Sequence, residues 1–238
     1  MSGFKRFFVL EVSQNTVVEG EEFLHAVNVL RIRKGEKIYL CDQTGEEYLA
    51  EITEIAKKYF CATLISKSVN QCQAKSQVTL VCGYLKGDKT EMVVQKATEL
   101  GVERIVVFSS EFCSAYMNEN KLQRLRRVAV EACKQCGRSK VPEVIYCDTF
   151  IKALEEGKKA ENKLFACEFA TKNEVDYGSL QGSTSIVVGS EGGFSNEEYQ
   201  KALDNGYKTV YLGKRILRAE TASIALTAIV MNALGELG

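Results

Sequence analysis

The sequence contains a single histidine, His25, and this scarcity excludes most histidine-based chemistry. A Ser-His-Asp hydrolase would have to use this one residue as its general base. His25 lies in an expected helix, where a capping or packing role is the favoured interpretation. One Cys-x-x-Cys, Cys133 to Cys136, has no second copy and no further histidines to complete a zinc site. We therefore expect no bound metal.

Long apolar runs are also missing, since none approaches the roughly 20 residues that a membrane span needs. The basic and then apolar N-terminus is short, is interrupted by Glu11 and lacks a small-residue cleavage site, which favours a strand over a signal peptide. Most of the nine cysteines lie within apolar runs, which is typical of buried thiols in a reducing compartment. These features predict a cytoplasmic protein with no membrane partner.

No excess of one charge exists, because 31 basic side chains balance 31 acidic ones. A global basic field that would attract nucleic acid is therefore absent. Between Lys121 and Lys140, however, seven basic residues accompany a single acid, Glu131. This strip is either a solvated helix face or a surface that contacts phosphates, and charge alone does not separate the two.

Residues 1–70 read mostly as strands, with one helix over 21–31 and a hairpin turn at 42–45. The expected strands are residues 7–12, 37–41, 48–55 and 60–69. We predict a small β-barrel-like domain over 1–70, followed by a polar linker at 71–76.

From residue 77 strands and helices alternate, which is typical of a parallel sheet covered by helices. The expected strands are 78–85, 104–108, 144–147, 164–169, 186–188 and 209–212, and the expected helices are 88–100, 120–136, 150–156, one from 196, and 219–237. Ser195 and Glu198 fit a capping box. The last helix is apolar nearly all round, so it either fills the core or meets a second copy of the chain. We predict an α/β domain over 77–238.

Residues 187–196, VVGSEGGFSN, place three glycines and one acid, Glu191, at the end of an expected strand. Open α/β sheets bind ligands at such strand ends. The turn lacks the GxGxxG of a nucleotide-dependent dehydrogenase, the lysine of a Walker loop and the nucleophile of a G-x-S-x-G elbow. The absent lysine disfavours a triphosphate, while a carboxylate suits a ligand with positive charge or hydroxyl donors. The alternative is a tight strand-to-helix turn without a ligand.

Residues 211–222, YLGKRILRAETA, again join a strand end, a glycine, a loop and a helix start. Two such strand ends in one sheet would form opposite walls of a single pocket. Glu220 and Thr221, in the first helical turn, suit the positive end of a helix.

Taken together, GSEGGFSNEE and LGKRILRAETA resemble the signature pair of the SPOUT methyltransferases, and most closely the bacterial family that methylates uridine N3 of 16S ribosomal RNA. Further matches, in the family's order, lie at residues 5–9, 25–31, 86–102 and 131–144. Two positions depart from the family. Ser190 stands where proline is usual, and residues 112–114 stand where an RNA-contacting arginine is expected.

The resemblance implies an α/β SPOUT domain with a parallel sheet and a C-terminal trefoil knot, preceded by a PUA-like β-barrel that binds RNA. It also implies a homodimer, S-adenosylmethionine as cofactor, and 16S ribosomal RNA or the small ribosomal subunit as partner. The implied cofactor contacts are Gly189, Glu191, Gly192, Gly193, Leu212, Gly213, Ile216, Leu217, Thr221 and Ala222.

Three residues take implied catalytic roles. Arg218 fixes the anionic base, and Glu191 or Glu220 takes its proton or orients the cofactor. The implied RNA contacts are Arg6, Arg124, Arg127 and Arg138. The alternative function is a non-catalytic RNA-binding protein with a SPOUT-like scaffold.

Overall fold

The structure is a computed structural model, which describes residues 4–113 and 116–238. Residues 1–3 of the predicted first domain, and Ser114 at the expected arginine position, lie outside this description. The chain divides into two compact units. Unit 1 comprises the described residues of Met1–Gln73 together with Cys133–Val141, and unit 2 comprises those of Ala74–Ala132 and Pro142–Gly238.

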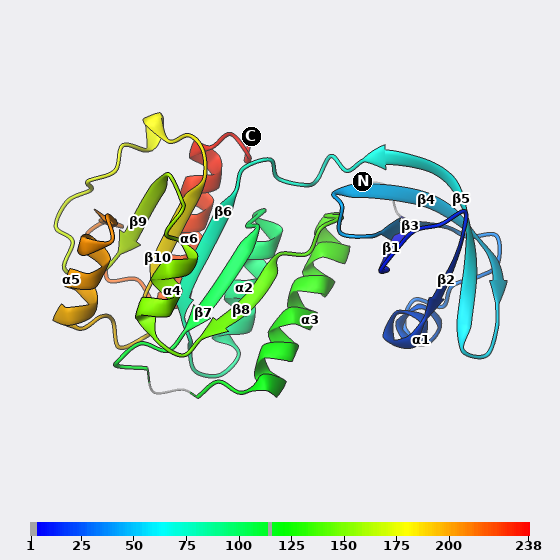
Figure 1. Ribbon diagram of the computed structural model, residues 1–238, viewed down its shortest axis with the longest axis horizontal. Coiled ribbons are helices and arrows are strands. Elements are labelled where there is room, and N and C mark those ends of the chain that lie inside the picture. The colour runs from blue at the N-terminus through cyan, green and yellow to red at the C-terminus, as the bar shows by residue number, and fades with distance from the viewer. Residues whose placement is uncertain (1–3, 114–115) are drawn as a thin grey trace. The chain divides into compact units, whose positions relative to one another are not determined.

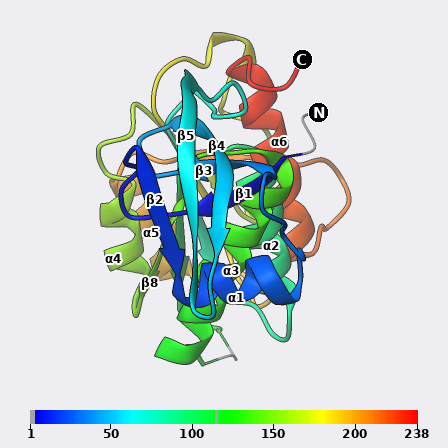
Figure 2. The same ribbon diagram turned by 90° about the vertical axis from the view of Figure 1, so that its right-hand side faces the viewer.

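Unit 1 is built on a curled five-stranded sheet of order β1-β3-β4-β5-β2 (Figure 2). Its strands are β1 (Lys5–Phe8), β2 (Asn15–Glu19), β3 (Lys37–Cys41), β4 (Glu46–Ile55) and β5 (Tyr59–Val69). Only the β1–β3 pair is parallel. Helix α1 (Gly20–Asn28) packs on β2 and β5. Alternating side chains fill the core, where the rings of Phe7 and Phe60 meet edge to face at 5.3 Å.

The predicted elements of unit 1 are confirmed in type, with two exceptions at the N-terminus. The first strand ends at Phe8 rather than at residue 12, because Phe8 pairs with the last residue of β3 and Leu10 is fully exposed. Strand β2 was not predicted, since only Thr16 and Val18 of its five residues are buried. Residues 37–41 form β3 with the predicted bounds.

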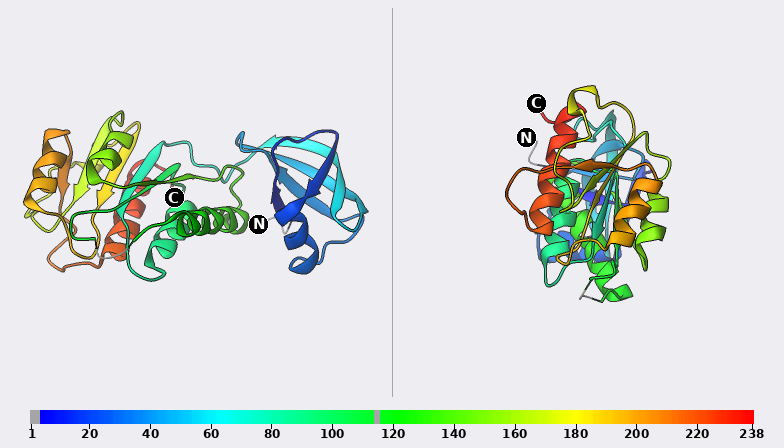
Figure 3. Two further views of the ribbon diagram at one scale, coloured as in Figure 1. Left: turned by 60° about the horizontal axis from the view of Figure 1, so that its bottom comes forward. Right: turned by 90° about the vertical axis from the view of Figure 1, so that its left-hand side faces the viewer.

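Unit 2 is an α/β fold whose six strands are all parallel, in the order β11-β9-β10-β6-β7-β8. The strands are β6 (Val78–Gly83), β7 (Arg104–Phe108), β8 (Glu143–Cys147), β9 (Asn162–Ala166), β10 (Thr184–Val188) and β11 (Lys208–Val210). Helices α2 (Lys89–Glu99) and α6 (Ala219–Ala233) pack together on one face, and α4 (Phe150–Glu156) and α5 (Asn196–Asp204) cover the other (Figures 1 and 3). A long helix, α3 (Glu119–Cys136), and a short 3-10 turn, η1 (Tyr177–Ser179), complete the elements.

The predicted parallel sheet is confirmed, and so are the bounds of β7 and α4. The capping box at α5 is confirmed as well, because the Ser195 hydroxyl accepts the N–H of Glu198 and the Glu198 carboxylate accepts the N–H of Ser195. The last helix ends at Ala233 instead of residue 237, since Gly235 takes a left-handed φ of 77°.

A buried aromatic cluster holds the glycine-rich turn on the sheet. Phe194, at the end of that turn, lies 4.5 Å from the ring of Phe165 in β9 and 5.3 Å from that of Phe150 in α4. A buried phenylalanine of this kind contributes about 3–5 kcal/mol when compared with alanine. The turn is therefore fixed to the core at its C-terminal side.

Candidate functional site

A cavity of about 660 Å³ lies at the carboxyl ends of β9, β10 and β11, three adjacent strands of the parallel sheet. This size suits a small-molecule ligand, and the carboxyl edge is where α/β sheets bind one. Gly189–Phe194 after β10 lines one part of it, and residues 210–219 after β11 line another. The two glycine-marked strand ends thus meet on one cavity, as their sequence pattern predicts.

Most of the sequence-predicted site residues lie on this cavity. The lining includes Gly189, Glu191, Gly192, Gly193, Leu212, Gly213, Ile216, Leu217, Arg218 and Ala222. Thr221 and Glu220 are not among the described residues that line it, although both belong to the first turn of α6. Ile216 lines the cavity and is 98% exposed, so its side chain is available for a ligand to cover.

The glycines of the turn after β10 are required by the protein's own packing. Gly193 has a φ of 70°, its N–H donates to the Ser190 carbonyl at 3.0 Å, and a Cβ there would overlap the Glu168 carboxylate. A Cβ on Gly192 would lie 2.6 Å from Cβ of Phe112. The sequence resemblance implies that these glycines contact the cofactor. The structure supplies a packing reason in addition.

Ser190, at the position where the resembled family usually has proline, is tied to the loop after β7. Its hydroxyl lies 2.8 Å from that of Ser110, and both residues are buried. A Cβ on Gly83, at the end of β6, would overlap the backbone nitrogen of Ser190. Ser110 was not predicted as part of the site, because nothing local in the sequence marks a contact across 80 positions.

Glu191 is ionised and held at the edge of the cavity. Its carboxylate forms an ion pair with Lys89 at 3.0 Å and accepts the backbone N–H of Lys86 at 3.1 Å. Partial burial acts to raise the pKa of Glu191, but the lysine and the N–H together outweigh it, so the pKa lies below its ordinary value. Lys89, at the start of α2, was missed by the sequence reasoning. It lies within the family match at residues 86–102, but its contact with Glu191 spans 102 positions, which a single sequence does not reveal.

Cations with no partner gather on the loop that leads into α6. Lys214, Arg215 and Arg218 are exposed and line the cavity, and no hydrogen bond or ion pair engages their side chains within residues 4–113 and 116–238. The backbone of Arg218 caps α6, since its carbonyl accepts the N–H of Ala222 at 2.8 Å. The arginine side chain is therefore fixed at its base and unengaged at its tip.

Two acids nearby differ in how they are placed. Glu168, after β9, lines the cavity with an exposed carboxylate that accepts the N–H of Phe194 at 3.3 Å. Glu220 is half-buried, and in the described part of the chain its Oε2 is buried without a hydrogen-bond partner. Glu168 was missed, because it follows a strand end that carries no glycine.

The four predicted RNA contacts fall into two groups. Arg124 and Arg127 are exposed on α3, where Arg124 pairs with Glu91 at 2.9 Å. Arg6 and Arg138 belong to unit 1, where Arg6 is partly buried and Arg138 is buried, with only 1% of it exposed. A direct contact of Arg138 with RNA would require this side chain to leave its position.

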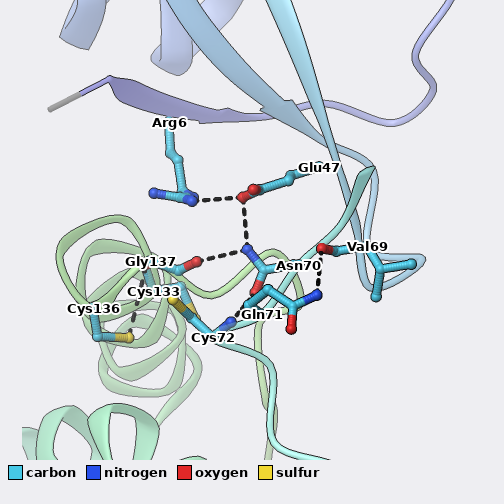
Figure 4. A network of polar contacts seen from close by, with 9 residues as sticks. All are labelled: Arg6, Glu47, Val69, Asn70, Gln71, Cys72, Cys133, Cys136 and Gly137. Atoms are coloured by element: carbon cyan, nitrogen blue, oxygen red, sulfur yellow. Dashed lines mark hydrogen bonds and ion pairs between the residues drawn. The ribbon is translucent and has the colours of Figure 1, made fainter. Parts of the chain in front are cut away.

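A polar network holds Arg6 in unit 1 (Figure 4). Arg6 pairs with Glu47 at 2.6 Å and lies over the ring of Tyr39. The amide of Asn70 donates to Glu47 at 2.7 Å and to the carbonyl of Gly137 at 2.9 Å. These bonds tie Gly137, which follows α3 and belongs to unit 1, to the strands of that unit.

Residues 4–113 and 116–238 contain neither a cluster of metal-binding side chains nor a membrane-spanning helix. No group of three or more His, Cys, Asp or Glu side chains there could hold a metal ion. Cys133, of the Cys-x-x-Cys pair, is buried, and burial raises the pKa of its thiol to about 12. Within the same residues, no helix has the length and apolar character to span a bilayer.

Known proteins share this arrangement over nearly their whole length. A family model described as an RNA methyltransferase domain matches residues 72–231, and one described as an RNA methyltransferase PUA domain matches residues 18–65. The chain is 32% identical to ribosomal RNA small subunit methyltransferase E of Mesomycoplasma hyopneumoniae, over 93% of this chain and 96% of that protein. It is 30% identical to the Bacillus subtilis protein of the same name, over 94% and 95%.

A solved structure agrees with both sequence relatives. Ribosomal RNA small subunit methyltransferase E of Neisseria gonorrhoeae, bound to S-adenosylmethionine, superimposes with a TM-score of 0.87 at 30% identity, covering 97% of this chain and 98% of that one. The predicted α/β SPOUT fold with a PUA-like first domain is confirmed. The chain therefore belongs to the RNA methyltransferase family that includes the ribosomal RNA small subunit methyltransferases E.

Proposed function

We propose that this protein transfers a methyl group from S-adenosylmethionine to N3 of a uridine in 16S ribosomal RNA of the small ribosomal subunit. The observation that carries the proposal is the cavity where Gly189–Phe194 and residues 210–219 meet beside the exposed Arg218. Support comes from the relatives named for small-subunit RNA methylation and from the related structure that binds this cofactor. The choice of uridine N3 rests on the resemblance of the two glycine-containing motifs.

The residues present fit this cofactor. S-adenosylmethionine carries no phosphate, and Lys89, which lines the cavity, is already paired with Glu191. Its sulfonium and ammonium groups are positive, and Glu168 is a lining acid that no ion pair engages in the described residues. We assign Glu168 to the ammonium or the ribose hydroxyls. The main chain of Leu212 to Leu217 would enclose the adenine, and Ile216 would become buried.

When bound, S-adenosylmethionine supplies an electrophilic methyl group. Uridine N3 carries a proton and is a poor nucleophile until it loses it. The guanidinium of Arg218, together with the positive end of α6, stabilises the negative charge that develops on the uracil. In the transfer an N–C bond forms as the C–S bond breaks, the electron pair of that bond stays on sulfur to give a neutral thioether, and the N3 proton passes to solvent water. Arg218 thus acts by making that proton easier to remove.

The two predicted acids take different parts in this proposal. Glu191 lines the cavity, but its ion pair with Lys89 lowers its pKa and makes it a weak base. We assign it to the orientation of the cofactor turn. Glu220 lies off the cavity in the described residues, so a role as proton acceptor would need a rearrangement at the start of α6.

The RNA substrate must present its base unpaired, because N3 takes part in base pairing. Lys214 and Arg215 at the cavity, and Arg124 and Arg127 on α3, are exposed cations suited to phosphate contacts. Arg6 and Arg138 stay predictions as RNA contacts, since Arg6 is engaged by Glu47 and Arg138 is buried.

We further propose a homodimer, a trefoil knot in unit 2 and a cytoplasmic location. For the dimer, α6 and η1 border an apolar hollow of about 590 Å³, beside which Ile229 and Leu237 are partly exposed. For the knot, β9 lies between β10 and β11 although it precedes both in the chain. For the location, all nine cysteines are free thiols.

Analytical ultracentrifugation tests the proposed homodimer. A fully active monomer would rule it out.

The reaction itself is tested with tritium-labelled S-adenosylmethionine and small ribosomal subunits that lack the modification. We expect label in 16S RNA and 3-methyluridine in its nucleoside digest. Label in another nucleoside would contradict the N3 assignment alone. RNA affinity without cofactor binding in calorimetry, and without transfer to any RNA, would favour the non-catalytic alternative.

A further inference from the structure

The loop between β7 and α3 holds an exposed aromatic ring next to the cofactor turn. Phe112 is 51% exposed. Its Cβ and its carbonyl oxygen lie so close to Gly192 that a side chain there would come within 2.6 and 2.8 Å of them. Gly192 lines the cavity, so Phe112 contacts its wall directly. The glycine is what lets this loop approach the turn.

Neighbours on both sides of Phe112 are anchored. The Ser110 hydroxyl lies 2.8 Å from that of Ser190 in the cofactor turn, and both residues are buried. The N–H of Glu111 donates to the carboxylate of Glu198 at 3.0 Å, and Glu198 is itself buried in the capping box of α5.

Beyond Phe112, the thiol of Cys113 donates to the carbonyl of Tyr84 at 3.2 Å, and its N–H donates to the carbonyl of Ser110 at 3.0 Å. The loop from Ser110 to Cys113 is therefore tied to the ends of β6 and β10 and to the start of α5. Anchors on either side restrict the backbone of Phe112, while about half of the residue stays exposed to solvent.

A ring held in this way loses little conformational freedom when a partner covers it. The partner that an RNA methyltransferase offers at its cofactor cavity is an unpaired nucleobase, and proteins recognise unpaired bases by stacking them on aromatic side chains. Stacking needs no charge, in contrast to the phosphate contacts made by arginine and lysine.

We propose that Phe112 stacks on an unpaired base of the RNA substrate and thereby positions that RNA at the cofactor turn. This inference rests on the proposed function, because it requires an RNA substrate at this cavity. Phe112 is a substrate-positioning residue in this scheme and takes no part in binding the cofactor.

The test compares Phe112→Ala, Phe112→Leu and Phe112→Tyr with the wild-type protein, using KM and kcat for methyl transfer to unmodified small subunits. We expect the alanine and leucine variants to raise KM about tenfold, the usual effect of losing one base–aromatic stack. Tyrosine keeps the ring and should stay within about twofold of wild type. The matched control is Ile151→Ala, which shortens a partly exposed apolar side chain on helix α4. This variant should leave both KM and kcat unchanged.

Calorimetry of S-adenosylmethionine binding and ultracentrifugation accompany the kinetics. An unchanged KM for Phe112→Ala, with an active wild type, overturns the inference and leaves the proposed function standing. A leucine variant that matches wild type overturns stacking as well. Loss of cofactor affinity or of the dimer in a Phe112 variant would also overturn the inference, because the ring would then contribute to the cofactor pocket or to a subunit contact. A wild type that methylates no RNA removes both proposals.

Discussion

Replacing Gly193 by alanine tests whether the conformation of the turn after β10 is needed for cofactor binding as well as for protein stability. Gly193 has a φ of 70°, a left-handed conformation that costs an alanine about 1–2 kcal/mol. The new Cβ would overlap the carboxylate of Glu168, which must swing away and give up its 3.3 Å bond from the N–H of Phe194, worth about 0.5–1 kcal/mol. The sum is about 2 kcal/mol, or a Tm lower by about 4–8 °C for a unit of this size.

The control is Gly206→Ala, in the turn between α5 and β11. Gly206 has a similar φ of 80°, but a Cβ there meets no atom within 4 Å, and it does not line the cavity among the described residues. We expect a stability loss of about 1–2 kcal/mol without any change in cofactor affinity. Gly193→Ala should instead weaken S-adenosylmethionine binding at least about tenfold, since Glu168 is displaced. Thermal unfolding and calorimetry in one buffer measure both; equal cofactor affinity in the two variants would refute the reasoning.

Three further predictions concern charged side chains. Arg218→Ala should keep the cofactor Kd and lose about 100-fold in single-turnover methyl transfer, with Arg218→Lys intermediate; unchanged turnover would remove Arg218 from the mechanism. Glu47→Ala leaves the partly buried Arg6 without this partner and should cost about 2 kcal/mol in urea unfolding, and Glu47→Gln less; equal losses would show that charge is not the cause. The contribution of Glu191, whose pKa is lowered by folding, is present above its unfolded pKa of about 4.3 and is lost as pH falls through the folded value. Cofactor affinity, measured by calorimetry across the acid range, should therefore fall at a lower pH in wild type than in Lys89→Ala; equal midpoints would contradict a role for the ion pair.

Local signals made the cofactor cavity predictable. Each glycine segment follows an apolar strand and precedes a helix start, and in a parallel sheet such ends meet at one edge. The capping box of Ser195 and Glu198 fixed a helix start to the residue for the same reason. These features depend on neighbours within a few positions, which a single sequence displays.

Contacts between residues far apart in the chain could not be predicted from the sequence. Ser110 meets Ser190 across 80 residues, and Glu168 enters the cavity from a strand end without a glycine signal. Arg138 looks in the sequence like one more cation of an exposed strip. It is buried because residues 133–141 belong to unit 1, where the amide of Asn70 donates to the carbonyl of Gly137.

A crystal structure of the protein soaked with S-adenosylmethionine tests the central claim most directly. We predict cofactor density between Gly189–Phe194 and residues 210–217, with the methyl group turned toward the side chain of Arg218. Density at another place on the protein, or none at a cofactor concentration that saturates binding in calorimetry, would contradict the account.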